Sequence, residues 1–128
     1  DSFKLYGASA TMMPDGQVKL SLFWESLDEM PGVDATIFIH VQNRNGDLVV
    51  GQDARPEQYP TFIWSKGERV QTDYTLDLAG VSADDLKVFV GMYTFPGLTR
   101  LPILQNGELV TDARVELGSL TELMTDGN

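Results

Sequence analysis

Residues 35–64, ATIFIHVQNRNGDLVVGQDARPEQYPTFIW, constrain the fold of this chain most strongly. The segment begins with apolar and polar residues in strict alternation, turns through Asn45-Gly46, and returns as a second extended run. Such alternation is typical of a half-buried strand, and Asn-Gly is a strong signal for the turn of a β-hairpin. A loop rich in aromatic and polar side chains, residues 53–64, follows the hairpin. Because rigid strands position such loops, we expect binding to occur there.

Period-two alternation recurs along most of the chain, and turn-forming Pro, Gly and Asn residues separate the alternating runs. Seven to eight strands at this short spacing predict an all-β fold. We expect an antiparallel two-sheet β-sandwich of immunoglobulin-like or jelly-roll-like kind. The expected strands cover residues 3–11, 18–25, 35–42, 48–52, 70–78, 86–93 and 109–117.

The size of the chain fits one domain. It has 128 residues, 42% of them apolar, which is sufficient for a hydrophobic core without disulfides, and it contains no cysteine. We expect residues 1–120 to form a single β-sandwich domain and the polar residues 121–128 to fray as a C-terminal tail. No apolar run approaches the roughly 18–20 residues that a membrane-spanning helix requires, so this segment is not expected to insert into a membrane.

The charge is strongly acidic, with 19 Asp and Glu against 9 Lys and Arg and a net charge of −10. A surface of this sign repels nucleic-acid phosphates and anionic lipid headgroups. The basic residues form no block along the chain, which argues further against nucleic-acid binding. We interpret the acidity mainly as a source of solubility.

Several separated motif residues match, in order, the pattern of a known family, in a resemblance that covers roughly residues 5 to 117. They are Trp24, Phe38-Ile39-His40, Asn45-Gly46-Asp47, Gln52-Asp53, Tyr59-Pro60-Thr61, Trp64, Gly67-Glu68, Asp73-Tyr74, Gly91-Met92-Tyr93 and Arg100-Leu101-Pro102. With these motifs the chain resembles a small β-sandwich module found at the C-terminal, extracytoplasmic end of bacterial membrane glycosyltransferase-like proteins, notably in filamentous green bacteria.

Two segments, residues 81–86 and 93–101, depart from the usual pattern of that family. The resemblance implies a non-catalytic accessory domain outside the cytoplasm, at the cell surface, in the periplasm or secreted. It implies no particular ligand.

His40 is the only histidine and therefore the first residue to consider for catalysis. Serines and aspartates are abundant, but a G-x-S-x-G nucleophile motif is absent and His40 lies in the middle of an expected strand beside Phe38. We expect His40 to be hydrogen-bonded to Asp53 or Asp73 on a covered face of the sheet. The sequence thus predicts a protein that is not an enzyme.

Metal sites have little support in the sequence. One histidine without cysteine cannot complete a zinc site, and the five methionines have no tight spacing that would favour Cu(I). The Asn43–Asp47 segment is similar to the start of a calcium loop but lacks its closing Glu, so a hairpin turn is expected. Calcium binding stays open at Asp28-Glu29 or Asp84-Asp85, and no other cofactor is expected.

The 53–64 loop carries the candidate ligand-binding residues. Sugar rings stack on Trp and Tyr, while Arg, Asp and Gln form hydrogen bonds with sugar hydroxyls. In the alternative, Trp64 belongs to the core and the loop covers Phe38 and His40. The candidate site consists of Asp53, Arg55, Gln58, Tyr59 and Trp64, with His40 beside them.

Two functions follow from these observations. The first is an extracytoplasmic accessory domain that binds a polysaccharide or other glycan through the 53–64 loop. The second is a structural domain that packs against a parent protein or against copies of itself at the cell surface. Exposure of Trp64 or Tyr59 favours the first function. Apolar edge strands, a tail that inserts into a neighbour, or tight self-association favours the second.

Overall fold

The computed structural model describes residues 3–28, 34–54, 59–78, 85–94, 100–105, 108–110 and 114–126. Within these residues the chain forms nine strands, one turn of 3-10 helix (η1) and one α-helix. In chain order they are β1 (Phe3–Met12), β2 (Val18–Ser26), β3 (Ala35–Gln42), β4 (Leu48–Ala54), η1 (Thr61–Ile63), β5 (Arg69–Leu76), β6 (Lys87–Thr94), β7 (Ile103–Gln105), β8 (Glu108–Val110), β9 (Val115–Ser119) and α1 (Leu120–Asp126).

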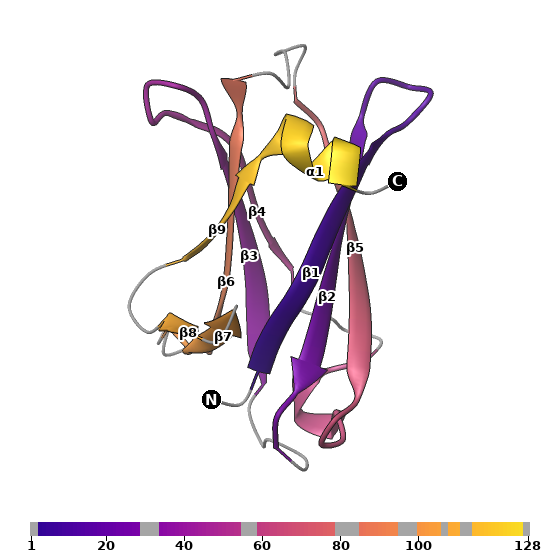
Figure 1. Ribbon diagram of the computed structural model, residues 1–128, viewed down its shortest axis with the longest axis vertical. Coiled ribbons are helices and arrows are strands. Elements are labelled where there is room, and N and C mark those ends of the chain that lie inside the picture. The colour runs from indigo at the N-terminus through magenta and orange to yellow at the C-terminus, as the bar shows by residue number, and fades with distance from the viewer. Residues whose placement is uncertain are drawn as a thin grey trace.

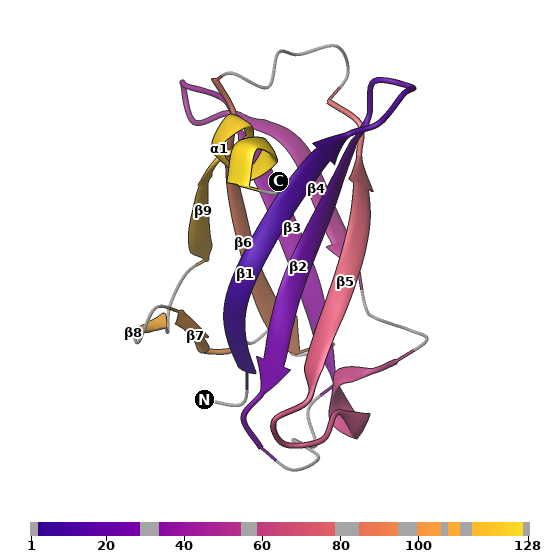
Figure 2. The same ribbon diagram turned by 45° about the vertical axis from the view of Figure 1, so that its right-hand side comes forward.

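The strands form two sheets that pack face to face (Figures 1 and 2). The first sheet has the order β5-β2-β1-β7-β8 and the second has the order β4-β3-β6-β9. Neighbouring strands are antiparallel except β1 and β7, which are parallel over a short stretch. The prediction of an all-β, two-sheet sandwich is confirmed. There are nine strands in place of seven or eight because the structure adds the three-residue strand β7 and has β8 and β9 in place of the one strand expected at residues 109–117.

The core lies between the two sheets and follows the alternation of the sequence. Leu20, Leu22 and Trp24 of β2 are fully buried, as are Ile37 and Ile39 of β3 on the opposing sheet. Burial of large apolar side chains is the main stabilising contribution to a domain of this size. The second sheet is therefore a rigid support, and its other side is left for polar and aromatic side chains.

The expected strand at residues 109–117 is the part of the fold prediction that is wrong. The structure places β8 in the first sheet, paired with β7, and β9 in the second sheet, paired with β6. Alternation reports which side chains are buried but not in which sheet a strand is paired, so two strands of similar pattern were joined into one.

The prediction of a fraying tail from residue 121 is also wrong, because residues 120–126 form α1. Leu120 is fully buried and Leu123 is nearly so, and both belong to the core. Ser119 and Glu122 form a capping box: the backbone N–H of Glu122 donates to Ser119 Oγ at 3.1 Å, and the N–H of Ser119 donates to Glu122 Oε1 at 3.0 Å. The helix closes one end of the sandwich beside β1 and β9 (Figure 2).

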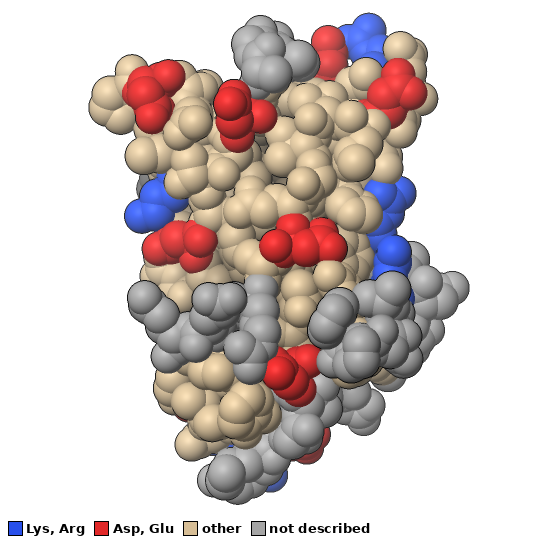
Figure 3. All heavy atoms as spheres, turned by 180° about the vertical axis from the view of Figure 1, so that it is seen from behind, with Lys and Arg blue, Asp and Glu red and all other residues tan. Residues whose placement is uncertain are grey.

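Charged groups are spread over the face of the molecule that is seen from behind. Figure 3 shows acidic side chains placed singly among uncharged atoms rather than gathered in one patch. This distribution agrees with the interpretation that the acidity favours solubility.

Candidate functional site

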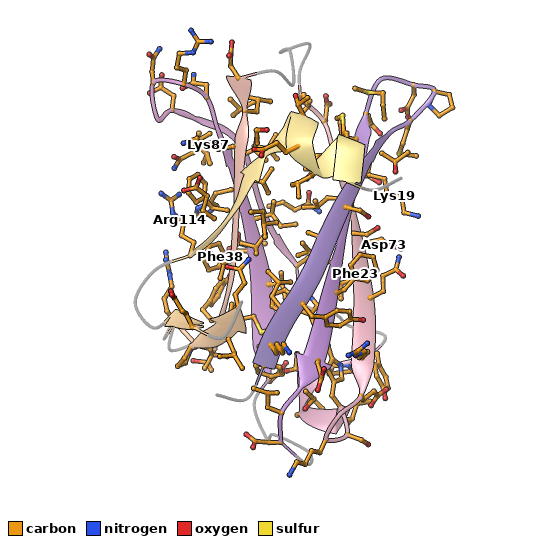
Figure 4. The ribbon with its side chains drawn as sticks, viewed as in Figure 1. Lys19, Phe23, Phe38, Asp73, Lys87 and Arg114 are labelled. Carbon is orange, nitrogen blue, oxygen red and sulfur yellow. The ribbon has the colours of Figure 1, made fainter. Side chains whose placement is uncertain are left out.

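The outer side of the second sheet, facing away from the core, gathers aromatic rings, guanidinium groups and hydrogen-bonding groups. Alternation in β3 and β6 directs these side chains outward, since their neighbours in the sequence are buried in the core. Figure 4 shows Phe38 and Arg114 on this side, and Phe23 and Asp73 on the first sheet. We call the surface the arginine–aromatic face and define it by Phe38, His40, Gln42, Asp53, Phe89, Tyr93, Arg100 and Arg114.

Phe38 forms the centre of one half of this face. It pairs with Gly91 of β6, and its ring lies so close to Gly91 that a Cβ at this position would be less than 3.0 Å from it. The guanidinium of Arg100 lies over the ring, 4.6 Å from its centroid, and Tyr93 lies beside it with the ring centroids 6.2 Å apart. Phe38 is therefore buried, although it points away from the core. Arg100 and Tyr93 contribute to the cover that was predicted from the 53–64 loop, of which residues 55–58 lie outside the described residues.

His40 lies next to Phe38, with the ring centroids 4.9 Å apart. Burial, followed by the positive charge of Arg114, lowers the pKa of His40. Asp53 acts in the opposite direction with a smaller effect, and Arg100 lowers the pKa by less still. His40 is thus neutral at neutral pH. Both guanidiniums are close enough to affect its protonation, which places His40 between the two halves of the face.

Of the two carboxylates predicted as hydrogen-bond partners of His40, Asp53 lies in β4 on the same side of the sheet, in register with Phe38. It acts on the imidazole through its charge, and among the described residues no hydrogen bond joins the two side chains. Its Oδ2 accepts a hydrogen bond from the Tyr93 hydroxyl at 2.7 Å. This hydrogen bond raises the pKa of Tyr93, so the phenol stays protonated as a donor. The alternative, Asp73, is wrong: it lies in β5 of the first sheet, where it accepts hydrogen bonds from Ser21 and Gln71.

Phe89 forms the centre of the other half of the face. The guanidinium of Arg114 lies 4.1 Å from the centroid of the Phe89 ring. With the Gln42 amide in the orientation that satisfies both groups, its oxygen accepts from the two terminal nitrogens of Arg114 at 2.6 and 3.3 Å. A surface cavity of about 410 Å³ adjoins Phe89 and Gln42 and is also lined by Arg44 and Lys87.

Trp64, the central residue of the predicted sugar-stacking loop, is fully buried. Its ring meets that of Phe3 edge to face at a centroid distance of 5.6 Å, and its Nε1 donates to the Tyr59 carbonyl at 2.9 Å. A buried ring offers no face to a sugar, so its assignment to the ligand site is corrected and the alternative, a core residue, holds. Arg55 and Gln58 lie outside the described residues.

The rest of the loop is held by hydrogen bonds. The Ala35 N–H donates to Thr61 Oγ1 at 2.9 Å, and the Tyr59 hydroxyl donates to Glu68. Tyr59, Phe62 and Ile63 remain exposed by 38%, 38% and 39%, and we call these three residues the η1 patch. The predicted site residues therefore separate: Asp53 and His40 belong to the arginine–aromatic face, Tyr59 to the η1 patch and Trp64 to the core.

The turn from β3 to β4 is a hairpin turn, as predicted. Asn43 Oδ1 accepts from the backbone N–H groups of Asn45 and Asp47, both at 2.9 Å, and Gly46 adopts a φ of 86°. Asn43 is thus occupied in closing the turn. Asp85, one of the residues considered for calcium, forms an ion pair with Arg44. Over the described ranges, no three His, Cys, Asp or Glu side chains are placed to hold a metal ion together.

The candidate site drawn from the sequence omitted four residues that complete the face, namely Phe89, Gly91, Arg100 and Arg114, although alternation had placed Phe89 on the side opposite the core. Phe89 and Gly91 could have been found, because they occupy the outward positions of an alternating strand. The two arginines come from segments before β7 and β9, and nothing in the local pattern places them over rings on β3 and β6.

Comparison with known proteins assigns the chain to no family. No protein-family model matches the chain. No curated protein matches it either. Among solved structures, the chain is similar to the variable (V) domain of the AgI/II polypeptide BspA from Streptococcus agalactiae, with 11% identity, 70% of this chain covered and a TM-score of 0.27. The match spans 60% of that domain's length. At this TM-score we draw no argument from the likeness. Across the residues described, no helix has the length and apolar character needed to span a bilayer.

Proposed function

We propose that this chain is a non-catalytic binding module that recognises glycans through the arginine–aromatic face. One observation carries the proposal: rings, guanidiniums and paired polar groups converge on one side of a rigid sheet, away from the core. Pre-organised groups lose little conformational entropy when a ligand binds. The proposed site is therefore the sheet surface, in place of the 53–64 loop that the sequence favoured.

The chemistry of the face suits a polyhydroxylated ligand. Tyr93 and His40 are half-buried and present ring surface, against which the C–H faces of a sugar can pack. Asp53 accepts from Tyr93 and keeps acceptor capacity for a sugar hydroxyl. Gln42 retains its amide N–H donors when its oxygen binds Arg114.

The surroundings of His40 support a role without catalysis. Its neighbours are the Phe38 ring, the guanidiniums of Arg100 and Arg114, and Asp53, and none of these is a hydroxyl or thiol nucleophile. Tyr93, whose raised pKa keeps it protonated, acts as a donor rather than as an attacking group. A location outside the cytoplasm follows from the resemblance of the sequence and is part of the proposal.

The experiment is isothermal titration calorimetry against a panel of neutral and acidic soluble polysaccharides. We expect heat of binding with at least one glycan, and about a tenfold loss of affinity in Tyr93→Ala. Tyr6→Ala is the matched control, because Tyr6 is an exposed aromatic residue on the first sheet, packed against Phe23 with ring centroids 6.1 Å apart. Equal losses of affinity in both variants, or no heat of binding with any of the polysaccharides, would contradict the proposal.

The η1 patch favours a second function, a structural domain that packs against a parent protein or a second copy of itself. Tyr59, Phe62 and Ile63 are large apolar residues within one short segment, each more than a third exposed. Clustered exposed apolar side chains mark interaction surfaces more often than isolated ones do. Light scattering across a concentration series, for wild type and for Phe62→Ser/Ile63→Ser, tests self-association. A monomer at every concentration in both proteins would remove the self-association form of this function.

A further inference from the structure

Basic residues are scarce in this protein, yet four of the 9 lie on or beside the arginine–aromatic face. Arg100 and Arg114 cover the two phenyl rings, and Arg44 and Lys87 line the adjoining cavity. The net charge of the chain is −10. This part of the surface therefore differs in sign from the average of the molecule, and such local charge is one of the features that select a ligand.

The two basic residues that line the cavity are each paired with a carboxylate. The two arginines that lie over phenyl rings have no such partner among the described residues. Lys87 pairs with Glu116 at 3.8 Å, and Arg44 pairs with Asp85. For the part of the chain that the structure describes, no carboxylate lies within 4.0 Å of the guanidinium of Arg100 or Arg114.

The first sheet provides a contrast. Arg69 also stacks on an aromatic ring, that of Tyr6 at 4.5 Å, but its Nε lies 3.4 Å from Glu25 Oε1. Stacking by itself is thus not the distinguishing feature. What sets Arg100 and Arg114 apart is a positive charge that no described carboxylate balances.

Stacking also prepares these arginines to bind an anion. A guanidinium held flat on a ring keeps its N–H groups at the edge, where a carboxylate can accept two parallel hydrogen bonds. The guanidinium carbons of Arg100 and Arg114 lie 4.6 and 4.1 Å from the ring centroids of Phe38 and Phe89, and the Gln42 oxygen accepts from both terminal nitrogens of Arg114. Little side-chain entropy is left to lose when the ligand arrives.

The arrangement repeats along the sheet. Phe38 pairs with Gly91 and His40 pairs with Phe89, so the two stacks are offset by two residues along the strands, which corresponds to about 7 Å. The cavity of about 410 Å³ adjoins the second of these two stacks, at Phe89. Two similar cationic sites in a row suit a polymer that carries an anionic group on successive units better than a single small anion.

Resting on the proposed glycan function, we infer that the arginine–aromatic face binds polysaccharides whose sugars bear carboxylates, that is, uronic-acid polymers. Arg100 and Arg114 take carboxylates, and Asp53 takes a hydroxyl of the same chain. Asp53 distinguishes this ligand from an acidic peptide or a polyphosphate, because its carboxylate needs donor hydroxyls and repels a ligand composed only of anionic groups. The ligand class thus follows from two cations and one acceptor on the same surface.

The test compares polygalacturonate with its methyl-esterified form by calorimetry, because esterification removes the charge and keeps the sugar backbone. We expect polygalacturonate to bind at least tenfold tighter than the ester, with affinity that falls as salt is added. Arg100→Gln and Arg114→Gln should each weaken binding about tenfold. The matched control is Arg69→Gln, which alters a stacked arginine on the other sheet and should leave affinity unchanged.

A second measurement needs no variant. His40 is the only histidine, so one imidazole resonance reports its titration in NMR spectra of the wild type. The charged groups facing it are Asp53, Arg100 and Arg114, with Tyr93 on the adjacent strand and Lys87 and Glu116 farther along the sheet. A bound carboxylate favours the imidazolium, so polygalacturonate should raise the pKa of His40 and the ester should not.

The outcomes separate this inference from the proposed function. Equal binding of polygalacturonate and its ester overturns the carboxylate preference and leaves glycan binding intact. Poly-L-glutamate binding as tightly as polygalacturonate overturns the assignment to a sugar polymer. If polygalacturonate, its ester and every neutral glycan fail to bind, both the inference and the proposed function are wrong.

Discussion

Gly91 decides how Phe38 packs on the outer side of the second sheet. Since glycine has no Cβ, the phenyl ring lies directly across the backbone of β6, and Arg100 then covers the ring from outside. A strand interior normally disfavours glycine, and close approach of another group is a common reason for finding one there. One missing side chain thus allows a large apolar residue to be buried on the solvent side of a sheet.

Gly91→Ala should destabilise the protein by about 1–3 kcal/mol, because the new methyl group would overlap the Phe38 ring and force it to move. Urea denaturation measures the change. Gly7→Ala is the control, since a Cβ there would lie 3.5 Å from Phe23, an ordinary contact. In a Phe38→Ala background the penalty of Gly91→Ala should disappear. A penalty that persists in that background would show that the ring is not its cause.

His40 should make stability depend on pH. Burial and the nearby guanidiniums lower its pKa below the ordinary 6.5, so in that range the unfolded chain binds more protons than the folded chain. The free energy of unfolding is therefore unaffected by His40 well above pH 6.5, and it decreases as the pH falls from 6.5 toward the lowered pKa. Between about pH 7.5 and about pH 5, wild type should lose more stability than His40→Gln. Carboxylates titrate in both proteins and cancel in the difference; parallel stability curves would count against the packing of His40 described above.

Both tryptophans are fully buried, which predicts weak quenching of their fluorescence by acrylamide in the folded protein. Trp64→Ala should cost about 3–5 kcal/mol, as expected for removal of a large core ring. Trp64→Phe, which keeps the edge-to-face contact with Phe3 and loses the hydrogen bond to the Tyr59 carbonyl, should cost less. Strong quenching combined with an unchanged denaturation midpoint in Trp64→Ala would show that Trp64 is exposed and not a core residue.

The strands were the most predictable elements, because each buries one face and therefore alternates. The alternation of β3 correctly placed Phe38 and His40 together on the side opposite Ile37 and Ile39. It could not place Arg114, which reaches Phe89 only because β9 pairs with β6. The side chains that share one strand could thus be predicted from the sequence to lie together. The contacts between segments far apart in the chain could not be predicted.

Helix α1 was missed although its signal was present. Ser119 and Glu122 have the spacing of a capping box, and Leu120 and Leu123 lie three residues apart, as on one face of a helix. Seven residues are too few for a helix to persist alone. Its stability comes from packing against β1 and β9, a tertiary contribution that a local pattern does not reveal.

Leu123→Ala should destabilise the domain by about 2–5 kcal/mol, because it removes a buried side chain that joins α1 to the core. The same substitution at Leu48, which is 57% exposed, should change stability by about 0.5 kcal/mol or less. Thermal denaturation followed by circular dichroism compares the two variants. If Leu123→Ala and wild type denature at the same temperature, α1 is not part of the folded domain in solution.

For the whole molecule, the two sheets carry different outer surfaces. On the first sheet the stacked Arg69 is balanced by Glu25, whereas Arg100 and Arg114 on the second sheet have no described carboxylate partner. The net charge of −10 disfavours long-range attraction of anionic ligands. Binding at the arginine–aromatic face must therefore depend on short-range, geometrically fitted contacts, which makes it selective rather than generally electrostatic.

The measurement that tests this account most directly is a ¹⁵N–¹H NMR titration of the labelled protein with polygalacturonate and with neutral polysaccharides. The account predicts that the shifted amides lie on β3, β4, β6 and the residues next to Arg100 and Arg114, while those of the first sheet and the η1 patch stay in place. Shifts centred on Tyr59, Phe62 and Ile63, or no shift with any glycan, would contradict it.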